Sequence, residues 1–256
     1  MLSTSYFVED KEQSLLEHLA ELRSRVRRVF ILLLVFMPVV FIFSPKIIKL
    51  LWSELVGEEM FAFSVTEWIF LNLSLSLVFT LILIYPYLML ELYLFAKPGL
   101  YENERNFLKT VLIPSYFLFL FGIIFAFKFL VPFLYKFSYG EEFFSVGRTL
   151  GNAVNIAFFF AISLQIPLAV YLLDRFKIVD YDTMKKLRLP IYLLIVMLIL
   201  NSPTNLSGIS QILVLILFGA MFELGLLLVG MSKRYKHSKK VKSNANSDRR
   251  SGRSWL

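Results

Sequence analysis

Residues 68–95 read WIFLNLSLSLVFTLILIYPYLMLELYLF, and this long apolar run decides the fold class. An apolar helix of about 20 residues crosses the hydrocarbon core of a bilayer, which is ~30 Å thick. Similar runs occur on both sides of it along the chain. We predict spans at residues 29–47, 68–95, 107–135, 152–173, 187–203 and 209–230. The sequence therefore predicts an all-α membrane protein with six transmembrane helices.

The last two spans are expected to be short. The fifth, counted from Leu187 to Leu200, is marginal for a full crossing of the bilayer. Only the turn at residues 201–205, which contains Pro203, separates it from the sixth.

The composition fits a membrane protein without a cofactor. Of the 256 residues, 57% are hydrophobic and 18% are charged, whereas soluble domains have about 45–50% apolar and about 25% charged residues. The chain contains no cysteine, which excludes disulfides, thiol catalysis and cysteine-based metal sites. Its two histidines, His18 and His237, lie far from any acidic cluster with metal-ligand spacing, so neither a metal nor a cofactor is expected.

The basic residues predict the orientation of the spans. Most of the 27 lysines and arginines precede the first span, lie in the second-to-third and fourth-to-fifth connections, or follow the sixth span. The exceptions are Lys46, Lys49, Lys128, Lys136 and Arg148. Because cytoplasmic segments are enriched in Lys and Arg, both termini are expected in the cytoplasm, with the chain in the cell inner membrane. The net charge of +8 is thus read as an orientation signal and not as a sign of nucleic-acid binding.

The chain divides into three predicted parts. Residues 1–28 form a cytoplasmic segment, in which apolar residues from Leu15 to Val26 recur at the spacing of an amphipathic helix. Residues 29–230 form the six-span membrane domain. Residues 231–256 are rich in Lys, Ser, Asn and Arg, which predicts a disordered basic tail that touches the lipid bilayer.

Two polar segments beside the spans carry motifs. The first reads His18-Leu19-x-Glu21-Leu22-Arg23-x-Arg25, and the second reads Phe95-x-x-Pro98-x-Leu100-Tyr101-x-x-Glu104-Arg105. Taken alone, the first predicts only an ion pair between Glu21 and Arg25, which are four residues apart on a helix. The second contains the turn signal Pro98-Gly99.

Together the two segments resemble the TatC family, the polytopic subunit of the twin-arginine protein translocase. Further matches follow in the family's order: Phe119-x-x-Gly122-x-x-Phe125-Ala126-Phe127, Gln165-x-Pro167, Ser210-Gln211 and Phe222-Glu223. The chain departs from the family pattern at five places. Gln165 stands where a glutamate is usual, Ala161 where a glycine, Leu217 where a proline and Tyr93 where a tryptophan is expected, and residues 201–205 replace the family's Thr-Pro-Pro-Asp turn.

The resemblance implies the function. A member of this family binds twin-arginine signal peptides at its cytoplasmic face. With single-span TatA- and TatB-type subunits it transports folded proteins, using the proton-motive force. The resemblance also implies a homo-oligomer in the receptor complex and no enzymatic activity.

Glu21 and Glu104 are the carboxylates of the two matching motifs, and we expect them to face each other and receive the arginine pair. Carboxylates suit this task because their contacts with guanidinium groups are bidentate, directional and strong. The other residues that the resemblance assigns to the signal-peptide site are Arg23, Phe95, Pro98, Leu100, Tyr101 and Arg105.

Three further polar residues are candidates for a role outside that site. Gln165 and Glu223 lie within predicted spans, where an unpaired polar group is costly. Gln165 either makes an interhelical hydrogen bond or serves as a polar anchor in a lipid-facing groove for a signal peptide or a partner helix, and the sequence leaves both readings open. Glu67, on the outer face, is expected to cap the helix of the second span.

The alternative function is a small-molecule or ion secondary transporter. Such proteins usually contain an internal repeat and polar residues near the membrane midplane. We find no convincing repeat between residues 1–130 and 131–256, and no hydrolase, metalloprotease or nucleotide-binding motif. The sequence therefore favours a signal receptor over a transporter or an enzyme.

Overall fold

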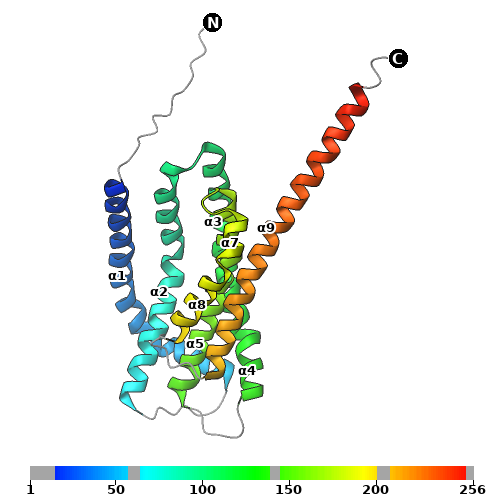
Figure 1. The fold of residues 1–256 in the computed structure, drawn as a ribbon. Helices are drawn as coiled ribbons and strands as arrows, with labels where there is room; N and C mark the ends of the chain where they lie inside the picture. Colours follow the sequence, from blue (N-terminus) through cyan, green and yellow to red (C-terminus); the bar gives the residue numbers. More distant parts are fainter. Residues whose placement is uncertain (1–14, 57–63, 139–144, 201–207, 252–256) are drawn as a thin grey trace. The chain divides into compact units, whose positions relative to one another are not determined.

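The computed structural model describes residues 15–56, 64–138, 145–200 and 208–251, and the regular structure within them is helical (Figure 1). The elements are α1 (Leu15–Leu55), α2 (Val65–Ala96), η1 (Lys97–Gly99), α3 (Glu102–Phe125), η2 (Ala126–Leu130), α4 (Val131–Ser138), α5 (Val146–Ser163), α6 (Ile166–Arg175), α7 (Tyr181–Lys186), α8 (Arg188–Leu200) and α9 (Gly208–Ser251).

Five helical segments of the described chain are long and apolar enough to cross a membrane, which confirms an all-helical membrane protein. A sixth apolar helix, Arg188–Met197, is shorter. The fifth predicted span is therefore short, as expected. The sixth is not short, because Gln211–Tyr235 forms a segment of 25 residues.

The chain folds into two compact units. The first comprises residues 1–117 and 141–154, and the second comprises residues 118–140 and 155–256. Each is described by itself below.

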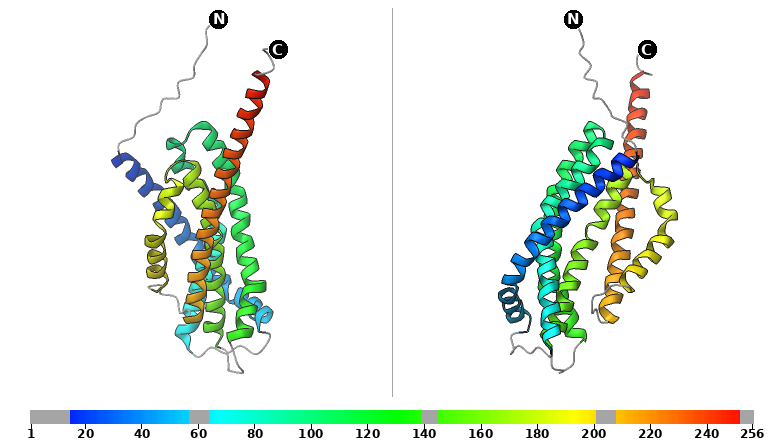
Figure 2. Two further views of the ribbon diagram at one scale, coloured as in Figure 1. Left: turned by 45° about the vertical axis from the view of Figure 1, so that its right-hand side comes forward. Right: turned by 90° about the vertical axis from the view of Figure 1, so that its left-hand side faces the viewer.

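In the first unit, the predicted amphipathic helix and the first span form one continuous helix, α1. Residue 28 is thus no boundary in the fold. Pro38 and Pro45 lie inside α1, and Figures 1 and 2 show the helix bending in its second half. Each proline removes a backbone hydrogen bond and crowds the preceding turn, which accounts for the bend.

Small and polar residues let α1 and α2 approach each other closely. Ser44 Oγ donates to Asn72 Oδ1 at 2.6 Å, and both residues are buried. One turn further along α2, Ser76 Oγ donates to the Asn72 carbonyl oxygen at 2.6 Å. Ile48 and Leu75 are fully buried in the same unit. Because lipid is as apolar as leucine, such polar and close-packed contacts hold membrane helices together.

In the second unit, the predicted fourth span is interrupted at Leu164 and Gln165, between α5 and α6. Pro167 lies in the first turn of α6, where its missing N–H costs no intrahelical hydrogen bond. The following α6 packs on α9, and Gly225 brings the two helices close, since a Cβ there would lie 3.1 Å from the Cα of Pro167. Val170, Met184, Phe222, Leu226 and Val229 form the buried cluster around this contact.

The end of α9 differs from the sequence prediction. Disorder was expected from residue 231, but in the structure the helix continues to Ser251 (Figure 2). Helix propagation explains the difference, because extending a formed helix requires no new nucleation and lysine and arginine are good helix formers. Residues 252–256 lie outside the described part of the chain.

We expect Gly122→Val to destabilise the second unit. A Cβ at residue 122 would lie 2.7 Å from the Cα of Ala161, so the helices that carry these two residues would have to separate. Overpacking of this kind costs about 1–3 kcal/mol, which thermal unfolding in detergent would detect. Gly219→Val is the matched control, because no atom lies within 4 Å of a Cβ built there. Equal stability of the two variants would contradict this close packing.

Candidate functional site

The first predicted motif lies in the initial turns of α1. Arg25 Nε donates to Glu21 Oε1 at 2.9 Å, and Arg25 Nη2 contacts the same oxygen. The ion pair expected from the i, i+4 spacing is therefore present. Both contacts use one oxygen, so within the described ranges Oε2 of Glu21 keeps no hydrogen-bond partner.

Glu91 of α2 joins this pair to a larger cluster in the same unit. Arg25 Nη1 donates to Glu91 Oε2 at 2.9 Å. Arg28 donates from Nε to Oε1 at 2.8 Å and from Nη2 to Oε2 at 2.9 Å, which makes a bidentate contact. The Tyr87 hydroxyl adds a hydrogen bond to Oε1 at 2.7 Å. One carboxylate thus ties two arginines of α1 to α2.

The cluster is balanced in charge, and its central pair of Glu91 and Arg25 is largely shielded from solvent. Its two negative charges, on Glu21 and Glu91, equal the two positive charges on Arg25 and Arg28. The Glu91 side chain is only 7% exposed and that of Arg25 is 15% exposed. A shielded carboxylate is stable only with charged partners, which the two arginines provide. The cluster therefore fixes Arg25, and through it the orientation of Glu21.

Sequence reasoning missed Glu91, Arg28 and Tyr87 as parts of this site. The available signal was the position of Glu91, an acidic residue within the apolar run 68–95. Such a residue needs a partner in or near the membrane. Its partners could not be identified from spacing, since they lie 63 and 66 residues away in the chain.

The second motif forms the connection between α2 and α3. Glu104 Oε2 accepts a hydrogen bond of 3.1 Å from the backbone N–H of Tyr101, directly before α3. A carboxylate in the first turn that reaches back to the preceding N–H is half of a capping box. Oε1 of Glu104 makes no hydrogen bond within the described ranges. Arg105 Nε donates to the Lys97 carbonyl oxygen at 2.8 Å, which closes the turn.

The remaining predicted site residues also lie in the first unit. Leu100 is buried at 8% exposure, whereas Tyr101 is 79% exposed. Phe95 is half-buried, whereas Pro98 and Arg23 are exposed. The two key carboxylates have different partners, Arg25 for Glu21 and a backbone amide for Glu104. That they face each other remains a prediction.

Glu67 corrects an expectation. It was expected to cap α2, but Ser64 does so, because its Oγ accepts the Glu67 N–H at 3.1 Å. Glu67 Oε1 instead accepts the backbone N–H of Arg148 at 3.2 Å, in the first turn of α5. Gly147 makes room for this contact, since a Cβ there would lie 2.1 Å from Glu67 Cγ. The carboxylate thus caps a helix other than its own.

The two polar residues inside spans have different surroundings. Glu223 of α9 accepts a hydrogen bond from Arg188 Nη2 at 2.8 Å and another from the Tyr192 hydroxyl, so its charge is paired by α8. Gln165 lies at the interruption between α5 and α6 and is half-buried. Its backbone N–H donates to the Ile162 carbonyl oxygen at 2.9 Å. Both readings of the Gln165 side chain remain predictions.

Comparison with known proteins gives a consistent result. The family model described as Sec-independent protein translocase protein (TatC) matches residues 17–216, a range that includes Glu21, Glu91 and Glu104. The Sec-independent protein translocase protein TatC of Desulforapulum autotrophicum is 27% identical over 252 residues, covering 94% of this chain and 93% of that protein. The protein of the same name from Methanocella arvoryzae is 28% identical over 227 residues, covering 86% and 94%.

A solved structure has the same fold. The crystal structure of a twin arginine translocase receptor, TatC, superposes with a TM-score of 0.72 at 22% sequence identity. The match covers 84% of this chain and 99% of that one.

Proposed function

Because the chain belongs to the TatC family of Sec-independent protein translocase proteins, we propose that its residues Glu21 and Glu104 receive the two guanidinium groups of a twin-arginine signal peptide. The chain is a core subunit of the twin-arginine translocase and a receptor for its signal peptides. It is a multi-pass membrane protein that serves transport and is not an enzyme.

One observation carries the assignment of the two carboxylates. Each of them uses one oxygen for an internal contact and keeps the other open within the described chain: Oε2 of Glu21 and Oε1 of Glu104. The internal contacts hold the side chains in place, so little conformational entropy remains to be lost when a ligand binds. The open oxygens can then accept charge-assisted hydrogen bonds from arginine.

The neighbouring residues support this recognition. Leu100 is buried beside the turn, and the exposed Tyr101 precedes the first turn of α3. With Phe95, they offer an apolar wall for the residues that flank an arginine pair. Arg23 and Arg105 complete the proposed site, and Arg105 holds the turn through the Lys97 carbonyl oxygen.

The orientation and partners belong to the same proposal. The excess of Lys and Arg at both ends of the chain supports a cytoplasmic location for both termini. We propose that the chain crosses the cell inner membrane with six spans. The exposed apolar residues of α1, among them Phe30, Leu34 and Ile42, are suited to lipid or to apolar partner helices. We propose single-span TatA- and TatB-type subunits as partners, a homo-oligomeric receptor complex, and transport of folded proteins driven by the proton-motive force.

A peptide-binding experiment tests the proposed function. The purified chain should bind a fluorescent signal peptide with Arg-Arg more tightly than the same peptide with Lys-Lys, by roughly tenfold. The reason is that a guanidinium presents a rigid, planar fork of five donors whereas a lysine ammonium is a compact point charge, and one charge-assisted hydrogen bond contributes about 1.5–3 kcal/mol. Equal affinities for the two peptides would contradict guanidinium recognition and leave the family assignment standing.

A further inference from the structure

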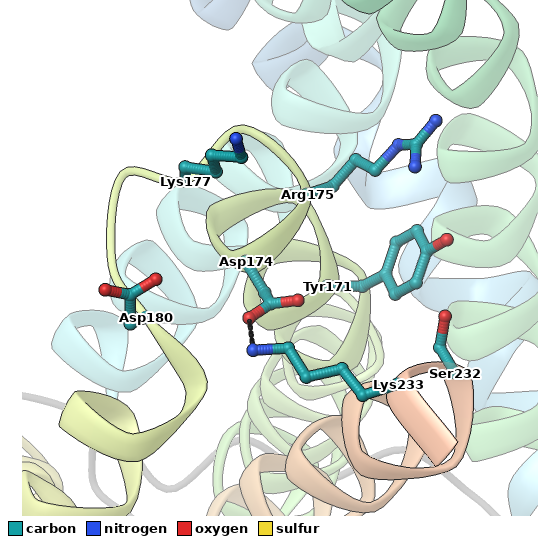
Figure 3. A pocket seen from close by; sticks show the side chains of 7 residues that line it. All are labelled: Tyr171, Asp174, Arg175, Lys177, Asp180, Ser232 and Lys233. Atoms are coloured by element: carbon teal, nitrogen blue, oxygen red, sulfur yellow. Dashed lines mark ion pairs between the residues drawn. The ribbon is translucent and has the colours of Figure 1, made fainter. Parts of the chain in front are cut away.

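We propose that a polar cavity at the ends of α6 and α9 binds the phosphate headgroup of an anionic membrane phospholipid with a hydroxylated headgroup, such as phosphatidylglycerol. The cavity has a volume of about 310 Å³ and lies within the second unit. Its lining comes from the last turn of α6, the connection to α7, and residues 232 and 233 of α9 (Figure 3). This site is separate from the signal-peptide residues, all of which belong to the first unit.

An ion pair forms one wall of the cavity. Lys233 Nζ lies 2.8 Å from Asp174 Oδ1, so these two charges neutralise each other. The same ammonium lies 5.3 Å from the centroid of the Tyr181 ring, which holds it from a second side. With this pair cancelled, the charged side chains that remain in the lining are two basic ones, Arg175 and Lys177, and one acidic one, Asp180 (Figure 3). The net charge of the remaining lining is positive and suits an anion.

Lys177 is placed at the cavity by an unusual backbone conformation. Its φ is 56°, in the left-handed region, and within the described chain it is the one residue other than glycine with a positive φ. The Lys177 N–H donates to the Asp174 carbonyl oxygen at 3.2 Å, and the Ile178 N–H donates to that of Leu173 at 3.0 Å, which closes the end of α6. Glycine is usual at this position.

A lysine at a glycine position indicates that the side chain has a use. Within the described chain, the Lys177 ammonium makes no hydrogen bond or ion pair, and Arg175 also lines the cavity. An ammonium and a guanidinium in the lining of one cavity are suited to a phosphate group.

The surroundings of the cavity favour a lipid as the source of the phosphate. Leu228 precedes Ser232 of the lining by one helical turn, so the two lie on the same face of α9, and Leu228 is 42% exposed. Met231 and Leu227 are exposed by 58% and 63%. Acyl chains can lie along this apolar surface while the headgroup occupies the cavity. Basic pockets between transmembrane helices bind anionic headgroups in this manner.

Asp180 gives the site a preference among headgroups. It lies across the cavity from Arg175 in Figure 3, and its carboxylate makes no cap hydrogen bond to α7. A carboxylate in this place can accept hydrogen bonds from the hydroxyl groups of a glycerol headgroup. It cannot form such hydrogen bonds with a choline headgroup, which has no donor.

Native mass spectrometry of the full chain in detergent, titrated with phosphatidylglycerol or phosphatidylcholine, tests the proposal. We expect phosphatidylglycerol to bind more tightly, and Lys177→Gln to weaken its binding about fivefold, the usual contribution of one lysine near an anionic lipid surface. Lys177→Gly should weaken it equally while keeping or raising the melting temperature, because glycine fits the left-handed backbone. Lys186→Gln is the matched control, since Lys186 is exposed, lies at the end of α7 and does not line the cavity.

Three results would overturn the proposal. Equal weakening by Lys177→Gln and Lys186→Gln would reduce the effect to general surface charge. Equal binding of the two lipids by the unchanged chain would remove the headgroup preference. Binding of inorganic phosphate alone, with displacement of phosphatidylglycerol by it, would make the cavity a site for the free anion. None of these outcomes bears on twin-arginine recognition, for which the Lys177 variants should behave like the unchanged chain.

Discussion

Glu91→Ala is expected to destabilise the chain by about 3 kcal/mol, the lower end of the range for removing one partner of a buried ion pair. Arg25 would then keep only Glu21 as a partner, although its side chain is just 15% exposed. The expected cost lies at the lower end because that remaining exposure allows some solvation of the guanidinium. Arg28, whose side chain is 46% exposed, can turn toward water and should add little. Unfolding in mixed micelles would measure the difference.

Two further variants separate charge from shape at Glu91. Glu91→Gln retains the side-chain length and an acceptor for the Tyr87 hydroxyl, so its cost measures mainly the lost charge. Combining Glu91→Leu with Arg25→Met removes both charges, and should recover part of the stability that Glu91→Leu alone loses. Glu102→Ala is the control, because Glu102 is exposed in the first turn of α3. A Glu91→Ala variant as stable as Glu102→Ala would show that the cluster does not hold α1 to α2.

Glu21→Gln and Glu104→Gln are each expected to weaken the binding of a twin-arginine peptide by roughly 10- to 100-fold. Each change removes the charge from an open acceptor oxygen while keeping the shape of the side chain, and a hydrogen bond to a charged group contributes about 1.5–3 kcal/mol. The loss should shrink at high salt, because exposed charges are screened within about 8–10 Å. Fluorescence titration at two salt concentrations would measure both effects.

The control for this experiment is Glu102→Gln, two residues before Glu104 in the same helical turn. Glu12→Gln is a second control, although Glu12 lies outside the described residues. If Glu21 serves only its ion pair with Arg25, Glu21→Gln should lower stability slightly and leave affinity unchanged. Affinities that are equal in all four variants would remove the recognition role and leave the family and the fold standing.

Local properties of the sequence determined much of this protein. Hydrophobic length predicted the membrane helices, because crossing a bilayer depends on a continuous run and not on distant contacts. The i, i+4 spacing predicted the pair of Glu21 and Arg25, and the ordered motifs indicated the family, which the match over residues 17–216 confirms. The local sequence predicted the ends of the helices less well. Helix α1 continues through residue 28, and α9 continues through the basic segment to Ser251.

Only the tertiary structure decided which charged groups meet. Arg28 and Glu91 are 63 residues apart, and Glu67 and the Arg148 amide are 81 apart, yet each pair is in hydrogen-bond contact. The periodicity of a sequence cannot predict such contacts, because they depend on which faces of two helices pack together. The cavity beside Lys177 has the same origin, since it combines the end of α6 with a turn of α9. The local sequence indicates which segments form apolar helices, whereas the packing of one helix against another determines the partner of each buried charge.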